Sequence, residues 1–295
     1  MQNKVYQVFT HKDLDGAISL LTFLWSHPND TITYQEISNL DINPVKDFIN
    51  KTINPPKTIL LNLYLREDFI PNMDQENVVI IDHHIDSKKY VDQFKKSKIV
   101  YSDYDSGSMF IRKLFQKNVE LSNDQKKLIL LANDYESGNF NFNESYDLNI
   151  IFWTQFKNDF SRFINTYKNG FKPFTDSQKE LIQSVKKEAE KKLSETKCYV
   201  GQILIEGQPK KVLAAMTNKF NSIVVDSLIK KHKPELLFYI NTQTENVSIR
   251  QPKQKEMINL LKFAQKYCDG NGTTLSAGGK ITPLFMELTK KLNPL

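Results

Sequence analysis

The sequence predicts an α/β protein: a doubly wound, mainly parallel sheet comes first, a helical connector follows, and a smaller α/β unit ends the chain. Three observations predict this order. The length of 295 residues suits two domains of ordinary size. Strand-like and helix-like segments alternate through the first half, as they do in βαβ units. A long run rich in Lys and Glu then separates this half from a second set of alternating segments.

The amino-terminal part alternates short apolar runs with helical patterns from residue 4 to about 135. Strands are expected at 4–10, 31–37, 58–65 and 77–82, and helices at 17–25, 44–51, 106–115 and 122–132. The runs TILLNLYL and NVVIID are almost wholly apolar, which is typical of strands covered on both faces of a parallel sheet. Residues 1–140 are therefore expected to form one domain.

The middle of the chain, residues 141–197, is expected to be helical and to link two domains. Thr175 and Gln178 fit a capping box at the start of the charged run SQKELIQSVKKEAEKKL, whose apolar positions keep a helical spacing. Residues 198–295 are expected to form the smaller α/β domain. Its strands are predicted at 199–205, 211–216, 235–241 and 246–250, and its helices at 222–232, 255–268 and 281–292.

The composition narrows the classes of function. Forty Lys and Arg against 34 Asp and Glu give a net charge of +6, which suits an anionic substrate but not a dedicated binder of duplex DNA. No run reaches the roughly 18 apolar residues that a membrane span needs. Cys198 and Cys268 lie far apart and form no CxxC pattern, so the reducing cytoplasm is the expected compartment.

The first group of chemically capable side chains is the segment HKDLDG, directly after the first predicted strand. His11, Asp13 and Asp15 alternate along the chain, so they project to one side if the backbone stays extended. Residues at the carboxyl end of a parallel strand face the crevice where α/β sheets bind ligands. One imidazole and two carboxylates suit manganese or a similar divalent ion. Gly16 would let the chain turn closely into the next helix.

A second group, Asp82-His83-His84, ends the strand 77–82 and so lies at the same edge of the predicted sheet. A third candidate, Asp134, ends an apolar helix in the segment LLANDYESGNF. Each group alone is also explained by turn formation or by hydrogen bonding at a strand end. Together and in this order, they indicate a site for two metal ions, the arrangement that clamps the attacking and leaving oxygens in phosphoryl displacement.

On these motifs the chain resembles the DHH phosphoesterase family, named for the Asp-His-His triplet, over most of its length. The segment HKDLDG resembles the first motif of the family, VVIIDHH the third, and Asp134 the aspartate of the fourth. The segment SDYDSGSMFIRKLF resembles the helix start that follows the triplet. The carboxy-terminal part resembles the DHH-associated substrate domain, through NVSIR and the glycine loop 270–279.

The resemblance implies metal ligands. His11 and Asp13 would bind one manganese ion, and the second would be held by Asp15, His83 and Asp134. Mg²⁺ or Co²⁺ are further candidates for the same ligands.

The resemblance also implies contacts to substrate. His84, with Asp82 beside it, would act in catalysis at the scissile phosphate. A terminal phosphate or nucleotide would be held by Arg250, Gly270, Gly272 and Thr273, across a cleft between the domains. Arg offers a planar fork for phosphate, and a glycine loop lets backbone N–H groups approach it.

The chain departs from the family pattern at two places. Asn62 occupies the end of the third strand, where the family has an aspartate that bridges both metals. An amide is neutral, so one or both ions should bind more weakly. In the glycine loop, Thr273 stands where relatives carry a histidine, and Asn271 replaces a glycine, so an imidazole contact to substrate is lost.

The leading hypothesis is a manganese-dependent phosphodiesterase or exonuclease that hydrolyses short single-stranded RNA or DNA, or small nucleotides, without a membrane partner. One alternative is a catalytically impaired protein that still binds nucleotides or nucleic acid, which Asn62 would explain. A cyclic-dinucleotide phosphodiesterase is a further alternative, because it would need the same core.

Overall fold

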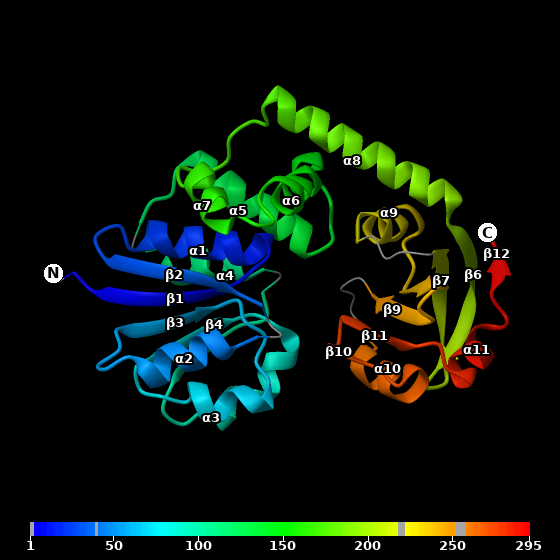
Figure 1. Cartoon of the computed structure of the whole chain (residues 1–295), viewed down its shortest axis with the longest axis horizontal. Helices are drawn as coiled ribbons and strands as arrows, with labels where there is room; N and C mark the ends of the chain where they lie inside the picture. Colours follow the sequence, from blue (N-terminus) through cyan, green and yellow to red (C-terminus); the bar gives the residue numbers. More distant parts are fainter. Residues whose placement is uncertain (1–2, 39–40, 105, 118, 218–221, 252–257) are drawn as a thin grey trace. The chain divides into compact units, whose positions relative to one another are not determined.

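The computed structural model describes residues 3–38, 41–104, 106–117, 119–217, 222–251 and 258–295. The chain divides into two compact units, Met1–Gln178 and Lys179–Leu295. Each unit is built around its own β-sheet (Figure 1). Within the described ranges, no helix is long and apolar enough to cross a membrane.

The first unit contains the predicted parallel sheet. Its strands are β1 (Val5–His11), β2 (Thr31–Ile37), β3 (Lys57–Leu61), β4 (Val78–Asp82) and β5 (Lys98–Tyr101), in the order β2-β1-β3-β4-β5. All four pairings are parallel, which confirms the doubly wound prediction. The strand order reverses between β1 and β3, so their carboxyl ends form the switch point where such sheets bind ligands.

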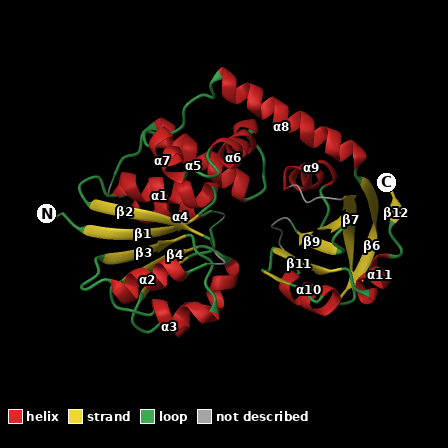
Figure 2. Ribbon diagram, in the orientation of Figure 1, coloured by secondary structure: helices red, strands yellow, loops and turns green. Residues whose placement is uncertain are grey.

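Helices cover both faces of this sheet (Figure 2). One face carries α1 (Leu14–Ser26), α4 (Gly107–Phe115) and α5 (Asn123–Glu136), and the other carries α2 (Asn43–Lys51) and α3 (Ile70–Met73). Short 3₁₀ segments lie at Glu67–Phe69 and Ile85–Gln93. Every residue of β4 is buried, as its apolar run predicts.

The strand predicted over 58–65 ends early, at Leu61. Asn62 follows with a φ of +57°, in the left-handed region, where a strand ladder cannot continue. Asn is one of the few residues that adopt this conformation readily. The apolar pattern beyond it, which suggested more strand, reflects Leu63 and Leu65, both buried in the core under the sheet.

The predicted helical middle of the chain is confirmed as α6 (Asn143–Gln155), α7 (Phe160–Tyr167) and α8 (Asp176–Glu195). The first two helices belong to the first unit, and their aromatic side chains form its core. The predicted capping box at the start of α8 is present. The Thr175 N–H donates to Gln178 at 3.0 Å, and the Gln178 N–H donates to the Thr175 hydroxyl at 3.3 Å.

The second unit is a mixed sheet with helices. Its strands are β6 (Lys197–Ile205), β7 (Gln208–Thr217), β8 (Leu236–Asn241), β9 (Asn246–Arg250), β10 (Asn271–Gly272), β11 (Ser276–Lys280) and β12 (Asn293–Pro294), in the order β10-β11-β9-β8-β7-β6-β12. Among the described strands, only β7 and β8 pair in parallel. The helices are α9 (Ser222–His232), α10 (Leu260–Cys268) and α11 (Pro283–Thr289).

Two expectations for the second unit need adjustment. The helix predicted over 255–268 begins at Leu260, after Asn259, whose side chain accepts from the Lys262 N–H; residues 255–257 lie outside the described residues. The glycine loop 270–279 contains a β-hairpin, β10–β11, which the sequence pattern did not predict because glycine has low strand propensity.

A tight turn joins β1 to α1 and fixes the first motif in place. The Asp13 carboxylate accepts the Gly16 N–H at 2.7 Å and so caps α1. The Thr10 hydroxyl donates to the Gly16 carbonyl at 2.8 Å. A Cβ atom on Gly16 would lie 2.0 Å from the His11 carbonyl oxygen, so the turn has no room for another residue. Close packing therefore explains the glycine of this motif.

We expect Gly16→Ala to displace the start of α1 or the His11 backbone. The clash is with backbone, which cannot rotate away, so the free energy of unfolding should fall by about 1–3 kcal/mol. Chemical denaturation of the full chain measures this loss. It is followed by the fluorescence of Trp25 and Trp153, which both belong to the first unit. A variant as stable as the natural chain would contradict the packing that is described for this turn.

Candidate active site

The side chains of the first motif lie at the carboxyl end of β1 and are partly exposed. His11 Nδ1 lies 2.6 Å from Asp13 Oδ2, and the two side chains are 22% and 28% exposed. Burial lowers the pKa of His11, but the Asp13 carboxylate outweighs it, and the pKa lies above its usual value. The pair therefore forms a charged, solvent-accessible half of the site.

Asp15 forms the buried half of the site and is held by the start of α4. Its two carboxylate oxygens accept the backbone N–H groups of Gly107 at 2.7 Å and Ser108 at 3.1 Å. An anion at a helix N-terminus is stabilised by the unpaired N–H groups there. Asp15 is only 2% exposed, so this contact fixes the carboxylate inside the protein.

His83 faces the Asp15 carboxylate through its outer ring nitrogen. His83 Nδ1 is 3.0 Å from the Tyr104 carbonyl oxygen, so Nδ1 carries the proton in the neutral ring. Burial, and then the charge of His84, lower the pKa of His83 and keep it neutral. Its Nε2 therefore presents a lone pair to Asp15 Oδ2, 3.5 Å away. Two electron-rich atoms that face each other in a buried place have the chemistry of a ligand pair for a cation.

Asn62 contributes a third buried acceptor next to this pair. Its Oδ1 is buried without a hydrogen-bond partner, and the same is true of His83 Nε2. Gly107, whose N–H donates to Asp15, lies against Asn62, and a Cβ there would lie 2.7 Å from Asn62 Oδ1. A buried polar atom without a partner is costly, and a bound cation would satisfy it. The chemistry of these donors thus fits a divalent ion.

His84 is held rigidly beside the first motif. Its Nδ1 lies 2.6 Å from Asp82 Oδ1, and its ring meets the Tyr64 ring edge-to-face at 6.2 Å. Burial alone would lower the pKa of His84. The Asp82 carboxylate, helped by the charges of Glu136 and Asp13, outweighs this and raises the pKa to about 9. His84 is therefore a cation at neutral pH, suited to contact a phosphate.

The carboxylate of Asp134 is occupied by hydrogen bonds within its own segment of the chain. It is buried, and it accepts hydrogen bonds from the Asn141 N–H at 2.9 Å, the Phe142 N–H at 3.1 Å and the Ser145 hydroxyl at 2.6 Å. These donors belong to the loop after α5 and to the start of α6. The hydrogen bonds give Asp134 a structural task, which is to fasten this loop.

A second acidic residue, Glu136, lies two positions further along the chain and acts on two histidines of the site through its charge. It is exposed, and its charge raises the pKa of both His11 and His84. Asp134 as a metal ligand stays a prediction, and Glu136 is a second acidic residue that the sequence analysis did not single out. A signal was present in the sequence: Glu136 lies on the last residue of α5 beside Ser137-Gly138, where a helix end exposes its side chains.

These residues are brought to one edge of the sheet, but they do not close around a common point. Among the described residues, no three His, Cys, Asp or Glu side chains lie together as a bound ion requires. Instead the residues are paired: the first motif internally, Asp82 with His84, and Asp15 with the start of α4. Binding of an ion would require these pairs to rearrange.

In the second unit, Arg250 and the predicted glycine loop are neighbours. Arg250 pairs with Ser276 across β9 and β11, and Ser276 exchanges hydrogen bonds with Thr273. The glycines serve packing: a Cβ on Gly270 would lie 2.1 Å from a β11 carbonyl oxygen, and Gly272 has a φ of +148°. The Thr273 hydroxyl thus closes the hairpin turn through its hydrogen bonds with Ser276.

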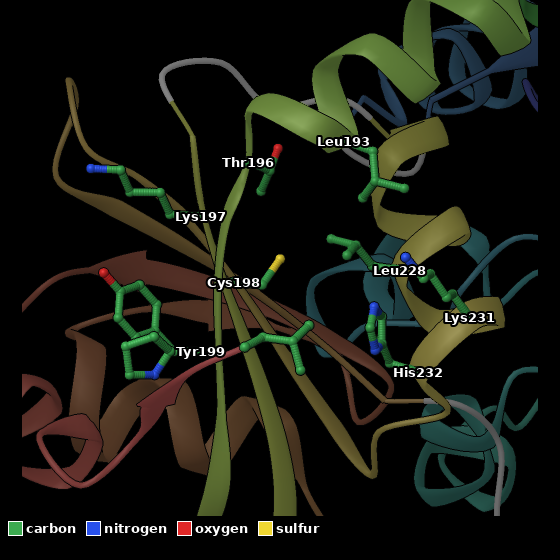
Figure 3. A pocket seen from close by; sticks show the side chains of 10 residues that line it. Leu193, Thr196, Lys197, Cys198, Tyr199, Leu228, Lys231 and His232 are labelled. Atoms are coloured by element: carbon green, nitrogen blue, oxygen red, sulfur yellow. The ribbon is translucent and has the colours of Figure 1, made fainter.

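A hollow of about 450 Å³ also lies in the second unit. Figure 3 shows Leu228, Lys231 and His232 of α9 on one side of it, and the start of β6 with Cys198 on the other. Its lining includes none of the predicted site residues and no Asp or Glu. It therefore does not suit a divalent cation.

Solved structures with the same fold include DHH-domain proteins. The DHH domain of a member of a family of ribosomal proteins matches with a TM-score of 0.63 and 14% identity, over 98% of this chain and 87% of that one. A pGpG-specific phosphodiesterase from Vibrio cholerae matches with a TM-score of 0.59 and 13% identity, over 97% of this chain and 96% of that one. RecJ from Thermus thermophilus, solved with Mn²⁺, matches with a TM-score of 0.53 and 9% identity, over 100% of this chain and 53% of that one.

No family model and no curated protein matches the sequence itself. The structural matches show that the chain has the two-unit α/β fold of DHH-domain proteins, which confirms the resemblance at the level of fold. The neighbours also include proteins that are named as a phosphodiesterase and an exonuclease.

We expect two neighbouring acids to behave differently when neutralised. Asp134→Asn should lower the free energy of unfolding by about 1–3 kcal/mol, because it weakens three hydrogen bonds to a buried carboxylate. Glu136→Gln should leave stability unchanged but weaken Mn²⁺ binding about tenfold or more. Thermal unfolding and calorimetric titration with Mn²⁺ measure the two effects. Equal Mn²⁺ affinity of Glu136→Gln and the natural chain would remove Glu136 from the ligand set.

Proposed function

We propose that the chain is a divalent-metal-dependent phosphodiesterase of the DHH type that hydrolyses short single-stranded oligonucleotides or small nucleotides. The observation that supports it most is the buried lone pair of His83 Nε2 facing the Asp15 carboxylate at the switch point of the parallel sheet. Two opposed electron-rich atoms destabilise a protein core, whereas a metal ion binds between such atoms.

The ligands that would hold the ion come from four segments of the first unit. We assign the exposed half to the first motif together with Glu136, in place of Asp134, and the buried half to Asp15, His83 and Asn62. When bound, a divalent ion such as Mn²⁺ supplies a water of lowered pKa and neutralises charge on phosphate oxygens. Whether one or two ions bind depends on how well the neutral Asn62 replaces a bridging carboxylate.

His84 is assigned to the substrate phosphate. Its raised pKa keeps it protonated, and the hydrogen bond to Asp82 fixes its ring, so its outer nitrogen can donate to a phosphate oxygen. A preorganised cation at this point stabilises the negative charge that grows on the phosphoryl group during displacement. Asp82 thus acts through His84.

Two observations support the proposed substrate class. One neighbour is specific for pGpG, a linear dinucleotide, and spans almost the same length as this chain. Arg250 and the adjacent hairpin, with Gly270, Gly272 and Thr273, would hold a terminal phosphate of such a substrate. We place the protein in the cytoplasm, where Cys198 and Cys268, both unbridged, would stay reduced.

A second candidate function is nucleotide binding without efficient hydrolysis. Asn62 favours it, because the amide at this buried position brings no charge to the metal. Cyclic dinucleotides are a further candidate substrate class, on the same residues.

Turnover of an end-labelled panel of RNA and DNA oligomers, two to ten nucleotides long, tests the proposed function in the presence of Mn²⁺. We expect cleavage of the shortest members, lost when EDTA is added. Asp13→Asn is the matched control, because Asn still caps α1 but removes the carboxylate, and it should reduce kcat/KM about a hundredfold or more. Binding of the panel without cleavage would favour the second candidate function.

Asn62→Asp should make the metal site stronger and the metal-free protein weaker. Without metal, a second buried carboxylate near Asp15 lacks a partner and should cost about 3–5 kcal/mol of stability. With Mn²⁺, the added charge binds the ion and should restore this loss. Melting temperatures with EDTA and with Mn²⁺ measure both effects, and the left-handed backbone accommodates either residue. An equal shift under both conditions would contradict a metal site at position 62.

A further inference from the structure

Three aromatic rings gather on the segment that leads away from Glu136. Tyr135 and Phe140 lie 5.7 Å apart, Phe140 and Tyr146 6.0 Å, and Tyr135 and Tyr146 6.4 Å, measured between ring centroids. The three side chains are only partly buried. The aromatic core of the same unit is different: Phe152, for example, is 1% exposed. The cluster therefore offers ring surface to solvent and is not part of that core.

The cluster is held rigidly. Asp134 fastens the loop between α5 and α6 through its carboxylate, and its carbonyl oxygen accepts the Asn139 N–H at 3.2 Å and the Phe140 N–H at 3.4 Å. Phe140 has a φ of +50°, which is rare and costly for a bulky residue. Such strain persists only where the surroundings enforce it, and it is typical of ligand-binding positions.

The segment begins at the candidate active site. Asn133 Oδ1 accepts the Ser106 hydroxyl at 2.8 Å, and Ser106 caps α4, the helix that binds Asp15. The last turn of α5 thus contacts the residue that caps the helix to which Asp15 is bound. Glu136, which acts on His11 and His84, lies next to Tyr135 in the chain. The cluster starts within one residue of the group that we assign to the metal.

We propose that Tyr135, Phe140 and Tyr146 form a stacking platform for a nucleobase of the substrate, so that the site prefers nucleotides to base-free phosphate esters. This inference rests on the proposed function and adds to it the part of the substrate that is recognised. Aromatic side chains stack on any base, because every base has a π-face, so the platform accepts different bases with similar affinity. A fixed platform also avoids the entropy cost of ordering the loop on binding.

The test compares a 5′-phosphorylated dinucleotide of adenosine with two analogues, in which a tetrahydrofuran abasic unit replaces one nucleoside or the other. For the natural chain, one of the two analogues should have a KM about 5- to 100-fold higher than the parent. Phe140→Leu and Tyr146→Leu should raise the KM of the parent towards that value and leave the KM of the abasic substrate unchanged. Leucine keeps the apolar bulk and the backbone strain but has no π-face.

Phe115→Leu is the matched control. Phe115 is also partly buried and packs against two rings, Phe23 and His27, but it lies at the far end of α4 from Gly107. This variant should change neither KM. Equal effects of Phe140→Leu on parent and abasic substrates, or no effect on either, would overturn the platform while the phosphodiesterase function stands.

A binding measurement keeps the two proposals separate. A dinucleotide that carries 2-aminopurine loses fluorescence when its base stacks, and this readout does not require turnover. The natural chain should quench the probe, and Phe140→Leu should abolish the quenching. Quenching without hydrolysis of any substrate would refute the enzyme and keep the platform. Hydrolysis without quenching would refute the platform alone.

Discussion

The contact between the Asp15 carboxylate and the first N–H groups of α4 is the constraint on which the candidate site depends. It joins the turn after β1 to a helix that follows β5, far along the chain, and it does so inside the protein. The helix start thus supplies two N–H donors to a carboxylate that water does not reach. The same contact places Gly107 against Asn62 and leaves His83 facing the carboxylate. Two strand ends and one helix start are thereby held in register around a buried negative charge.

The candidate site has an exposed half with several charged side chains and a buried half with few. His11, Asp13 and His84 lie where water can screen their charges, whereas the buried carboxylate of Asp15 has the uncharged side chains of His83 and Asn62 beside it. A carboxylate at position 62 would place two like charges in the interior without an ion. Under the proposed function, the amide would make the metal-free form easier to fold, at the expense of affinity for the ion.

The sequence was sufficient for the parallel sheet, its helices and the two motifs at strand ends, because apolar runs and alternating polar residues report burial directly. It was not sufficient where the conformation of the backbone or the direction of a side chain determines the structure. The end of β3 depends on the left-handed conformation of Asn62, which leaves no mark on the apolar pattern. The choice between Asp134 and Glu136 depends on which side of a helix end each carboxylate faces, and both have the chemistry that the motif requires. The hairpin β10–β11 is hidden because its glycines lack the side chains by which strands are recognised.

Under the proposed function, the opposition of His83 Nε2 and Asp15 would also link the lifetime of the folded protein to the supply of metal in the cell. A ligand that binds only the folded state stabilises it by mass action, by about 1.4 kcal/mol for each tenfold rise in free ion above the dissociation constant. Under the proposed function, a scarcity of divalent ions would leave two lone pairs opposed in the interior and raise the unfolded fraction. Proteases act on that fraction, so the abundance of the protein would follow the metal content of its surroundings.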